Sequence, residues 1–404
     1  MAEPAARRPG DRAAGARLVR LDIVRGAAVF GILLVNVWAF AWGLTALRYG
    51  TLAPDAPWAE RAVIFLVAGL AEFKSYPVFA FLFGAGFALH TRALRRTLRS
   101  WPAALALYRR RLLLLLGIGV AHGMLIWSGD VLSFYAFGGL LLLPLARARL
   151  RHVMQIGYVI GAFFLLTMLV MSLTVLGARG SAEITDAILA YQNLRAIYTS
   201  GGPGAIALER MQDFAYSHMS GLVYFLPHTL LLFIFGILAA RLGWLSRPER
   251  YRRQWRRVAL WGFGLGLPLN LLWGWVALRD ALDPYQRQWN VMLWQEVLYL
   301  AGPCLAAAYI ASLMLAGPRW VGPLGRWLAP VGRMALSNYL MQSVVGVLVL
   351  QGVGLGWGAN ISGTGLMAFC GALIVLQIGC SRWWLVRFGQ GPVEAWWRRR
   401  SLGR

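Results

Sequence analysis

Long apolar runs recur from one end of the chain to the other, and each is near the ~20 residues that a helix needs to cross a bilayer. They lie at about 22–44, 74–92, 109–128, 131–147, 152–177, 214–240, 256–278, 290–316, 333–352 and 363–385. Since 59% of the 404 residues are hydrophobic and the mean hydropathy is +0.58, a soluble domain is excluded. We predict one all-α integral membrane domain over 1–404, a polytopic transmembrane helical bundle of about ten spans.

The net charge of +24 is distributed in a pattern typical of membrane proteins. Arginines cluster in short segments between the apolar runs, at the N-terminus through Arg25 and then from Arg92 to Arg111, Arg147 to Arg151, Arg241 to Arg257, Arg319 to Arg333 and Arg382 to the end. No basic domain stands apart from the spans, so retention of basic loops in the cytoplasm explains the charge better than nucleic-acid contacts do. Both termini are therefore predicted to be cytoplasmic, with basic tails at 1–21 and 386–404, and membrane lipid is the expected surrounding.

Residues 58–93 decide the orientation of everything after them. Two crossings here would place the arginines of 92–111 and all later basic loops outside, whereas one crossing keeps them inside. One crossing is therefore predicted. Residues 58–72 would then form an amphipathic helix along the outer interface, and 178–213 an extracytoplasmic loop.

The cysteines indicate neither a disulfide nor a metal site. Cys304, Cys370 and Cys380 lie in or beside apolar segments without C-x-x-C spacing. We expect them to be small core residues and expect no bound metal. Any chemistry must then come from other polar side chains within the spans.

Two polar pairs in different spans repeat one spacing. Arg25 and Asn36 in the first span, like Arg111 and His122 in the third, are eleven residues apart, so each pair shares a helix face with its second member ~16 Å deeper. Both spans enter from the cytoplasm, so Asn36 and His122 should lie at similar depth, with the arginines at the inner mouth of an anion-binding pore. The alternative is that the arginines anchor helix ends while Asn36 and His122 hydrogen-bond helices together.

Three further residues extend this candidate site. Asp130 lies eight residues beyond His122, ~12 Å along a continuous helix, so it can orient His122 only if the "SGD" break bends the chain. Capping of the next span is an equally good role for Asp130. Arg333 and Asn338 belong to a polar stripe in "GRMALSNYLMQS" that either holds a cytosolic ligand or joins helices.

Five motifs together resemble one family. They are "RLDIVRGAAVFGILLVN", "FAFLFGAGFAL", "HGMLIWSGDVLSFYA", "GRMALSNYLMQS" and "RFGQGPVEAWW". In this order they are similar to the bacterial YeiB-like membrane proteins, the family of domain of unknown function 418, over nearly the whole chain. That family resembles in turn the transmembrane acyltransferases, such as heparan-alpha-glucosaminide N-acetyltransferase, through the LDxxRG…VN opening.

The resemblance implies an acyltransferase of the bacterial inner membrane. Such an enzyme passes an acyl group, by the same resemblance acetyl, from cytosolic acyl-coenzyme A to an acceptor on the far side, a sugar or glycan. Asn36 is carried over as an active-site residue. The acyltransferase motif has a histidine shortly after that asparagine, whereas residues 37–57 contain none, so His122 is expected to take its place.

This hypothesis assigns a role to each candidate. The phosphates of acyl-coenzyme A would be held at the inner mouth by Arg25, Arg111, Arg333 and Asn338. Asn36 would polarise the thioester carbonyl, His122 would act as general base or transient acyl carrier, and Asp130 would orient His122.

Two other classes of function fit the same residues. A transporter or flippase for a small or lipid-linked substrate would use the pore as a permeation path, although the sequence shows no inverted repeat of the kind transporters have. A membrane scaffold without a ligand leaves the matched depth of the polar groups unexplained. The sequence leaves open the acyl group, the acceptor and whether the chain forms a homo-oligomer.

Overall fold

In the computed structural model the described residues, 9–44, 47–177, 182–284 and 290–402, form helices joined by turns and loops, with no strand among them. The all-α, polytopic membrane class is confirmed. The helices and helical turns are α1 (Pro9–Trp42), α2 (Trp58–Leu70), α3 (Ser75–Leu98), α4 (Trp101–Leu125), α5 (Leu132–Leu141), η1 (Leu143–Ala146), α6 (Leu150–Gly177), α7 (Ala182–Ser200), α8 (Pro203–Val223), α9 (Phe225–Arg241), α10 (Arg252–Trp261), η2 (Gly262–Gly266), α11 (Leu267–Leu282), α12 (Asn290–Leu315), α13 (Pro318–Arg333), α14 (Ala335–Leu350), η4 (Trp357–Ala359), α15 (Gly363–Phe388) and α16 (Pro392–Leu402).

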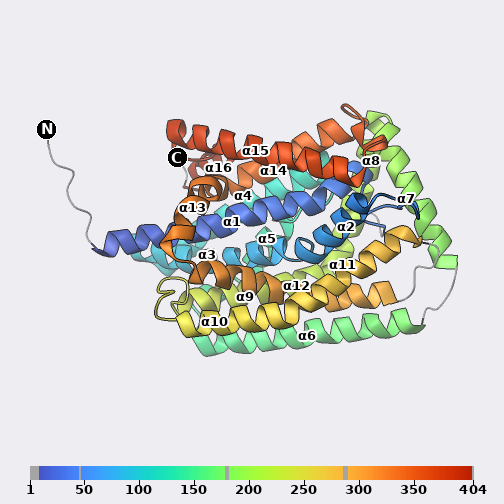
Figure 1. Ribbon diagram of the computed structural model, residues 1–404. Coiled ribbons are helices and arrows are strands. Elements are labelled where there is room, and N and C mark those ends of the chain that lie inside the picture. Colours follow the sequence, from blue (N-terminus) through green and yellow to red (C-terminus); the bar gives the residue numbers. More distant parts are fainter. Residues whose placement is uncertain (1–8, 45–46, 178–181, 285–289, 403–404) are drawn as a thin grey trace.

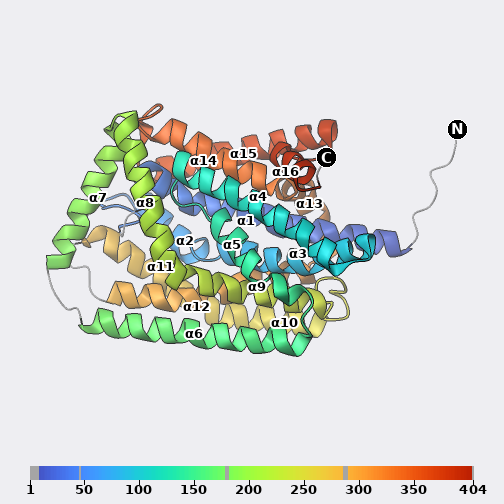
Figure 2. The same ribbon diagram turned by 180° about the vertical axis from the view of Figure 1, so that it is seen from behind.

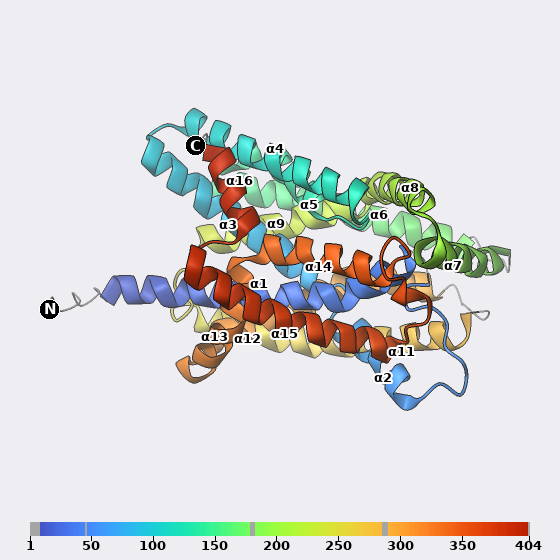
Figure 3. The same ribbon diagram turned by 90° about the horizontal axis from the view of Figure 1, so that it is seen from above.

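Most of the long helices lie roughly along one axis of the molecule (Figure 1). α1 begins at the end of the bundle where α16 and the α13–α14 junction lie, which we call the α16 end. The opposite end is covered by α7 and α8, which run across the other helices (Figure 2). Seen from above, α1 passes through the middle (Figure 3), and 67% of its apolar stretch is buried in the protein, against 17% for α6 on the outside. The core therefore forms around α1.

The number of membrane spans depends on how broken helices are counted. Among the described residues, six helical segments are long and apolar enough to cross, or up to eight if the bent pairs α8–α9 and α13–α14 each count as one span. Those pairs bend by 59° and 75°. α4 is outside this number because every long stretch of it contains the arginines of 109–111, and α5 has only ten residues. The count of ten and the cytoplasmic termini stay predictions.

Glycines allow two pairs of helices to pack backbone against backbone. A Cβ on Gly26 of α1 would lie 3.0 Å from the carbonyl carbon of Leu328 in α13, and one on Gly84 of α3 would lie 2.6 Å from that of Phe233 in α9. Small residues serve this purpose in membranes, where lipid removes the hydrophobic drive between helices and close packing has to replace it. Gly332 faces α1 in the same way. The start of α1 is thus fixed against the end of α13.

The segment 58–98 is one apolar unit with a break at residues 71–74. Phe73 has a φ of 57°, a left-handed conformation in which the helix cannot continue. Glu72 is buried at the break and accepts hydrogen bonds from Tyr49 at 2.7 Å and from Trp273 at 2.9 Å. Lys74 donates to the carbonyl of Ala68 at 2.9 Å. The charges that the break brings into the bundle therefore have partners.

One predicted interfacial helix is present, and two segments predicted as loops are helical. The predicted interfacial helix 58–72 is present as α2, but Ile64 and Val67 are buried and Gly69 packs on the backbone of α11. Its position at an interface stays a prediction. The predicted loop 178–213 consists largely of α7 and the first half of α8, and the basic segment before Arg333 is the helix α13.

The orientation can be tested by cysteine labelling. Asp55 and Arg95 are exposed; Asp55 precedes α2, and Arg95 lies in the last turn of α3, at the other end of the segment. In a background with serine at Cys304, Cys370 and Cys380, an impermeant thiol reagent added to intact cells should label Asp55→Cys and not Arg95→Cys, because the basic end is retained inside. Labelling of Arg95→Cys from outside would show that the orientation is reversed.

Candidate functional site

A cavity of 360 Å³ lies between α1, α3, α4, α5, α14 and α16, within the ~300–1,000 Å³ typical of small-molecule sites. Its lining includes Arg25, Arg111 and Arg333, so the structure brings together the three arginines expected at one mouth. Aromatic and aliphatic side chains form most of the remaining wall, among them Val29, Ile32, Phe83, Leu115 and Tyr135. The cavity is therefore basic at one end and mainly apolar beyond it.

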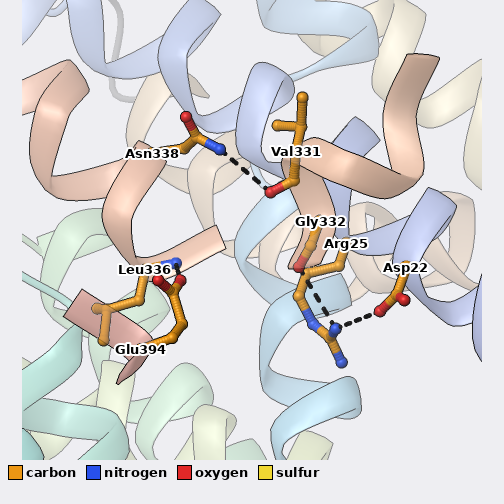
Figure 4. Close-up of polar contacts among 7 residues, drawn as sticks. All are labelled: Asp22, Arg25, Val331, Gly332, Leu336, Asn338 and Glu394. Atoms are coloured by element: carbon orange, nitrogen blue, oxygen red, sulfur yellow. Dashed lines mark hydrogen bonds and ion pairs between the residues drawn. The ribbon is translucent and has the colours of Figure 1, made fainter. Parts of the chain in front are cut away.

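Arg25 is held at the cavity from two sides (Figure 4). Its guanidinium lies 2.8 Å from Asp22 in the same helix and 3.4 Å from the carbonyl of Gly332 in α13. Across the same mouth, Glu394 of α16 accepts hydrogen bonds from the backbone N–H groups of Leu336 and Ser337, at 2.9 and 3.1 Å. A carboxylate at these first N–H groups of α14 satisfies donors that the helix itself leaves free.

Arg111 is held by the C-terminal helix. Its guanidinium carbon lies 3.8 Å from the ring centroid of Trp397, and the indole N–H of Trp397 donates to the Arg111 carbonyl at 2.9 Å. Stacking on tryptophan orients a guanidinium and leaves its edge free for an anion. The terminal motif "RFGQGPVEAWW" thus places two of its residues, Glu394 and Trp397, in the cavity wall.

Beyond the far wall of the cavity, His122 and Asp130 form a buried pair. The distance from His122 Nδ1 to Asp130 Oδ1 is 2.9 Å, and the two residues are only 2% and 3% exposed. The other carboxylate oxygen accepts the backbone N–H of Ser133 at 2.8 Å. Asp130 therefore does both things that the sequence left open: it orients His122 and it caps the start of α5.

The contact exists because the chain reverses directly after α4. The N–H groups of Ile126 and Trp127 both donate to the His122 carbonyl at 2.9 Å, which ends the helix and turns the chain back. α5 then begins beside Gly119, where a Cβ would lie 2.8 Å from Asp130 Oδ2 and 2.9 Å from Ser133 Cα. The ~12 Å expected along a continuous helix is thus replaced by direct contact.

Three buried polar groups around the His122 ring are not fully hydrogen-bonded in the described structure: two ring nitrogens have no partner, and a hydroxyl near the backbone of Val131 has no acceptor for its proton. They are His122 Nε2, Tyr339 Oη and Trp127 Nε1. The ring of Tyr339 lies 5.3 Å from that of His122, centroid to centroid, and the ring of Trp127 lies 6.3 Å away. Buried polar groups are nearly always paired, so such a group of atoms indicates a place for a polar ligand. Tyr339 also lines the cavity, whereas His122 and Trp127 do not.

Asn36 lies outside the cavity lining, further along α1. Arg25, Val29 and Ile32 line the cavity, and Asn36 follows on the same helix face, four residues after Ile32. The side chain is half-buried, and no hydrogen bond joins it to His122 or to any other described residue. Its amide is therefore free to bind a ligand.

Asn338 lies outside the cavity lining. Its amide donates to the Val331 carbonyl at 3.2 Å and to Ser381 at 3.0 Å, which ties α14 to α13 and α15 (Figure 4). The predicted stripe through Arg333 and Asn338 does not exist as one helix face, because the chain bends by 75° at Met334 between α13 and α14. Arg333 turns to the mouth and Asn338 to the helix interface.

Several residues of the site were not singled out from the sequence, although Trp127, Tyr339 and Trp397 lie within the motifs that resemble the family. Tyr339, Trp127 and Trp397 look like ordinary aromatic residues of a span or its end, and His218 belonged to a predicted span. The structure places His218 Nε2 2.7 Å from Ser133 Oγ, between the rings of Phe134 and Phe214. No group of three or more metal-ligating side chains occurs in the part of the chain that the structure describes.

Comparison with known proteins shows similarity to a family whose description states no function. The family described as "Protein of unknown function (DUF418)" matches residues 239–404. The chain is 30% identical to "Uncharacterized protein YxaH" of Bacillus subtilis (strain 168), over 95% of this chain and 93% of that protein. It is also 30% identical to "Uncharacterized protein YeiB" of Escherichia coli (strain K12), over 96% of both chains. No solved structure matches.

The tight start of α5 gives a matched pair of substitutions. Gly119→Ala should lower stability by about 1–3 kcal/mol, because its methyl group would press on Ser133 and Asp130 and separate the buried pair. Gly117→Ala in the same helix meets nothing within 4 Å and should leave stability unchanged or slightly raised. Thermal unfolding of the purified variants in detergent compares the two. Equal unfolding temperatures would show that α5 is not held against Gly119.

Proposed function

The chain belongs to the YeiB-like DUF418 family of membrane proteins, and from that premise we propose that it is a transmembrane acyltransferase. It takes an acyl group, acetyl in the simplest case, from cytosolic acyl-coenzyme A. It passes this group to the hydroxyl or amine of an extracytoplasmic acceptor, a sugar or glycan, across the bacterial inner membrane.

One observation carries the proposal. A buried His122–Asp130 pair with an unpartnered Nε2 lies beside Tyr339, which also lines a cavity with three arginines at its mouth. A base oriented by a carboxylate is the arrangement that activates a hydroxyl or amine. The arginines provide a separate site for an anion, so the geometry suits a donor with a charged head and a reactive tail.

Acyl-coenzyme A has this form, since its phosphates lie on a nucleotide head and its thioester at the end of a long, thin arm. Arg25, Arg111 and Arg333 would hold the phosphates through charge-assisted hydrogen bonds. The arm would then follow the apolar wall. Along α4 the eleven residues from Arg111 to His122 rise by ~16 Å, so donor head and reacting carbonyl are well separated.

The His122 side chain is suited to act as the base. Asp130 accepts the proton of Nδ1, so in the neutral ring Nε2 keeps a lone pair for the acceptor's proton. As the acceptor oxygen or nitrogen attacks the thioester carbon, Nε2 takes its proton. The carbon–sulfur bond then breaks, and the proton passes from Nε2 to the leaving thiolate. Asp130 stabilises the imidazolium between these steps.

The carbonyl oxygen needs donors as negative charge develops on it. The Tyr339 hydroxyl and the Trp127 N–H are buried, have no acceptor for their protons and belong to rings beside His122. Donors that are already in place cost no reorganisation during the reaction. Asn36 is the third candidate for this role, on the evidence of its helix face and the family resemblance.

Donor binding can be tested at the arginines. Arg25→Gln and Arg111→Gln should each weaken binding of acetyl-coenzyme A by roughly 10- to 100-fold, the effect of losing ~1.5–3 kcal/mol of charged hydrogen bonding. The loss should shrink at high salt. Isothermal titration of the purified protein measures it, with the exposed Arg110→Gln in the same helix as the control. Unchanged affinity for acetyl-coenzyme A in the Arg25/Arg111 double variant would show that these arginines only anchor their helices.

The catalytic role of His122 calls for an isosteric variant. His122→Ala would leave Asp130 buried with one partner fewer, which costs ~3–5 kcal/mol, so a loss of activity in this variant could not be separated from a loss of stability. His122→Asn keeps an N–H for Asp130 and removes the base. It should lower kcat by ~10²–10⁴-fold with little change in KM for the donor. Tyr339→Phe should lower kcat as well, and the exposed His152→Asn should not.

Acyl transfer to a sugar acceptor by protein in vesicles, followed with labelled acetyl-coenzyme A, provides the assay. Full turnover by His122→Asn, at normal KM, would show that His122 takes no part in the reaction. Uptake of a solute into vesicles without any acyl donor would favour the transporter.

A further inference from the structure

A second polar pocket, separate from the donor cavity, lies at the ends of α3 and α9. Its volume is 340 Å³, and it is lined by four arginines together with Ser246 and Tyr251: Arg92, Arg96, Arg241 and Arg247. Arg92 and Arg96 are one helical turn apart on α3. Arg247 follows the turn after α9. The two pockets share no lining residue.

One of these arginines is fixed in place. The guanidinium of Arg241 donates to the carbonyls of Ala148 at 2.8 Å and Ala146 at 3.1 Å, and also to that of Leu145. These carbonyls lie at the end of η1 and just after it, where a helical turn has acceptors that its own N–H groups do not fully satisfy. Arg241 therefore anchors the floor of the pocket, and the other three side chains, which are exposed, surround it.

The pocket has positive charge without a matching negative one. No carboxylate lines it, and the nearest acid in the sequence, Glu249, forms its ion pair with Arg20 at 3.3 Å. Four cations in one small pocket repel each other unless an anion joins them. The hydroxyl groups of Ser246 and Tyr251 in the wall already donate to the carbonyls of Gly243 at 3.1 Å and Leu242 at 2.8 Å, so the donors for phosphate oxygens are the guanidinium groups.

We infer that this pocket binds the phosphate head group of an anionic phospholipid. Basic pockets between membrane helices on the cytoplasmic side are typical sites for such head groups. The rim supports a lipid over free phosphate, because Leu89 and Leu242 beside the arginines are 42% and 44% exposed. Their apolar surface is placed where acyl chains would continue from the head group. The inference is independent of the acyl-transfer proposal.

Lipid binding to the purified, delipidated full chain in neutral detergent tests this site. Phosphatidylglycerol should raise the unfolding temperature in a saturable way, whereas phosphatidylcholine at the same concentration should not. The Arg92→Gln/Arg96→Gln/Arg247→Gln variant should bind phosphatidylglycerol at least tenfold more weakly. Arg241 is left intact because its contacts hold η1.

A control variant loses the same charge elsewhere. Arg253, Arg256 and Arg257 of α10 are exposed and outside the pocket, so their triple glutamine variant should bind phosphatidylglycerol like the wild type. Equally weak phosphatidylglycerol binding in both variants would show that general surface charge causes the effect, and the proposed site would be wrong. An equal rise of unfolding temperature with inorganic phosphate would overturn the lipid assignment, and so would an equal rise with phosphatidylcholine.

Discussion

The buried hydrogen bond between His122 and Asp130 is the interaction on which the candidate site depends. Removing a carboxylate from water costs several kcal/mol, so it is tolerated only when both oxygens have partners. Here one oxygen accepts from His122 and the other from the N–H of Ser133. Both contacts require α4 to end at Leu125 and α5 to start against Gly119. The "SGD" break and Gly119 are therefore both needed to give the buried carboxylate of Asp130 its two partners.

Backbone packing explains why arginines from distant parts of the chain meet. Gly26 and Gly332 are the contact points of α1 and α13, and they directly follow Arg25 and directly precede Arg333. With no side chain at either glycine, the neighbouring arginines reach the same mouth, where Arg25 also bonds the Gly332 carbonyl. A larger residue at either glycine would separate the helices and move the two charges apart.

The sequence was informative where one helix decides the geometry. The eleven-residue spacing placed Arg111 and His122 on one face because α4 is unbroken between them. It failed where the chain bends. The contact of Asp130 depends on the reversal at 126–131, and the proposed stripe from Arg333 to Asn338 crosses the bend at Met334. Unpaired donors such as Tyr339 Oη were unpredictable for a different reason, since the lack of a partner is a property of the packed structure.

The two ends of the bundle differ in a way that matters for transfer across a membrane. At the α16 end the cavity has its arginine mouth, whereas at the other end Arg210 of α8 bonds the Leu125 carbonyl at 2.6 Å and Gln351 at 2.9 Å. Gln351 in turn donates to the Phe40 carbonyl at 3.1 Å, so this cluster joins α8 to the ends of α4, α14 and α1. A pore open at both ends would leak ions and admit water to the thioester. Under the proposed mechanism the acceptor therefore has to reach His122 past these contacts, which lie at the end of the bundle opposite the arginine mouth.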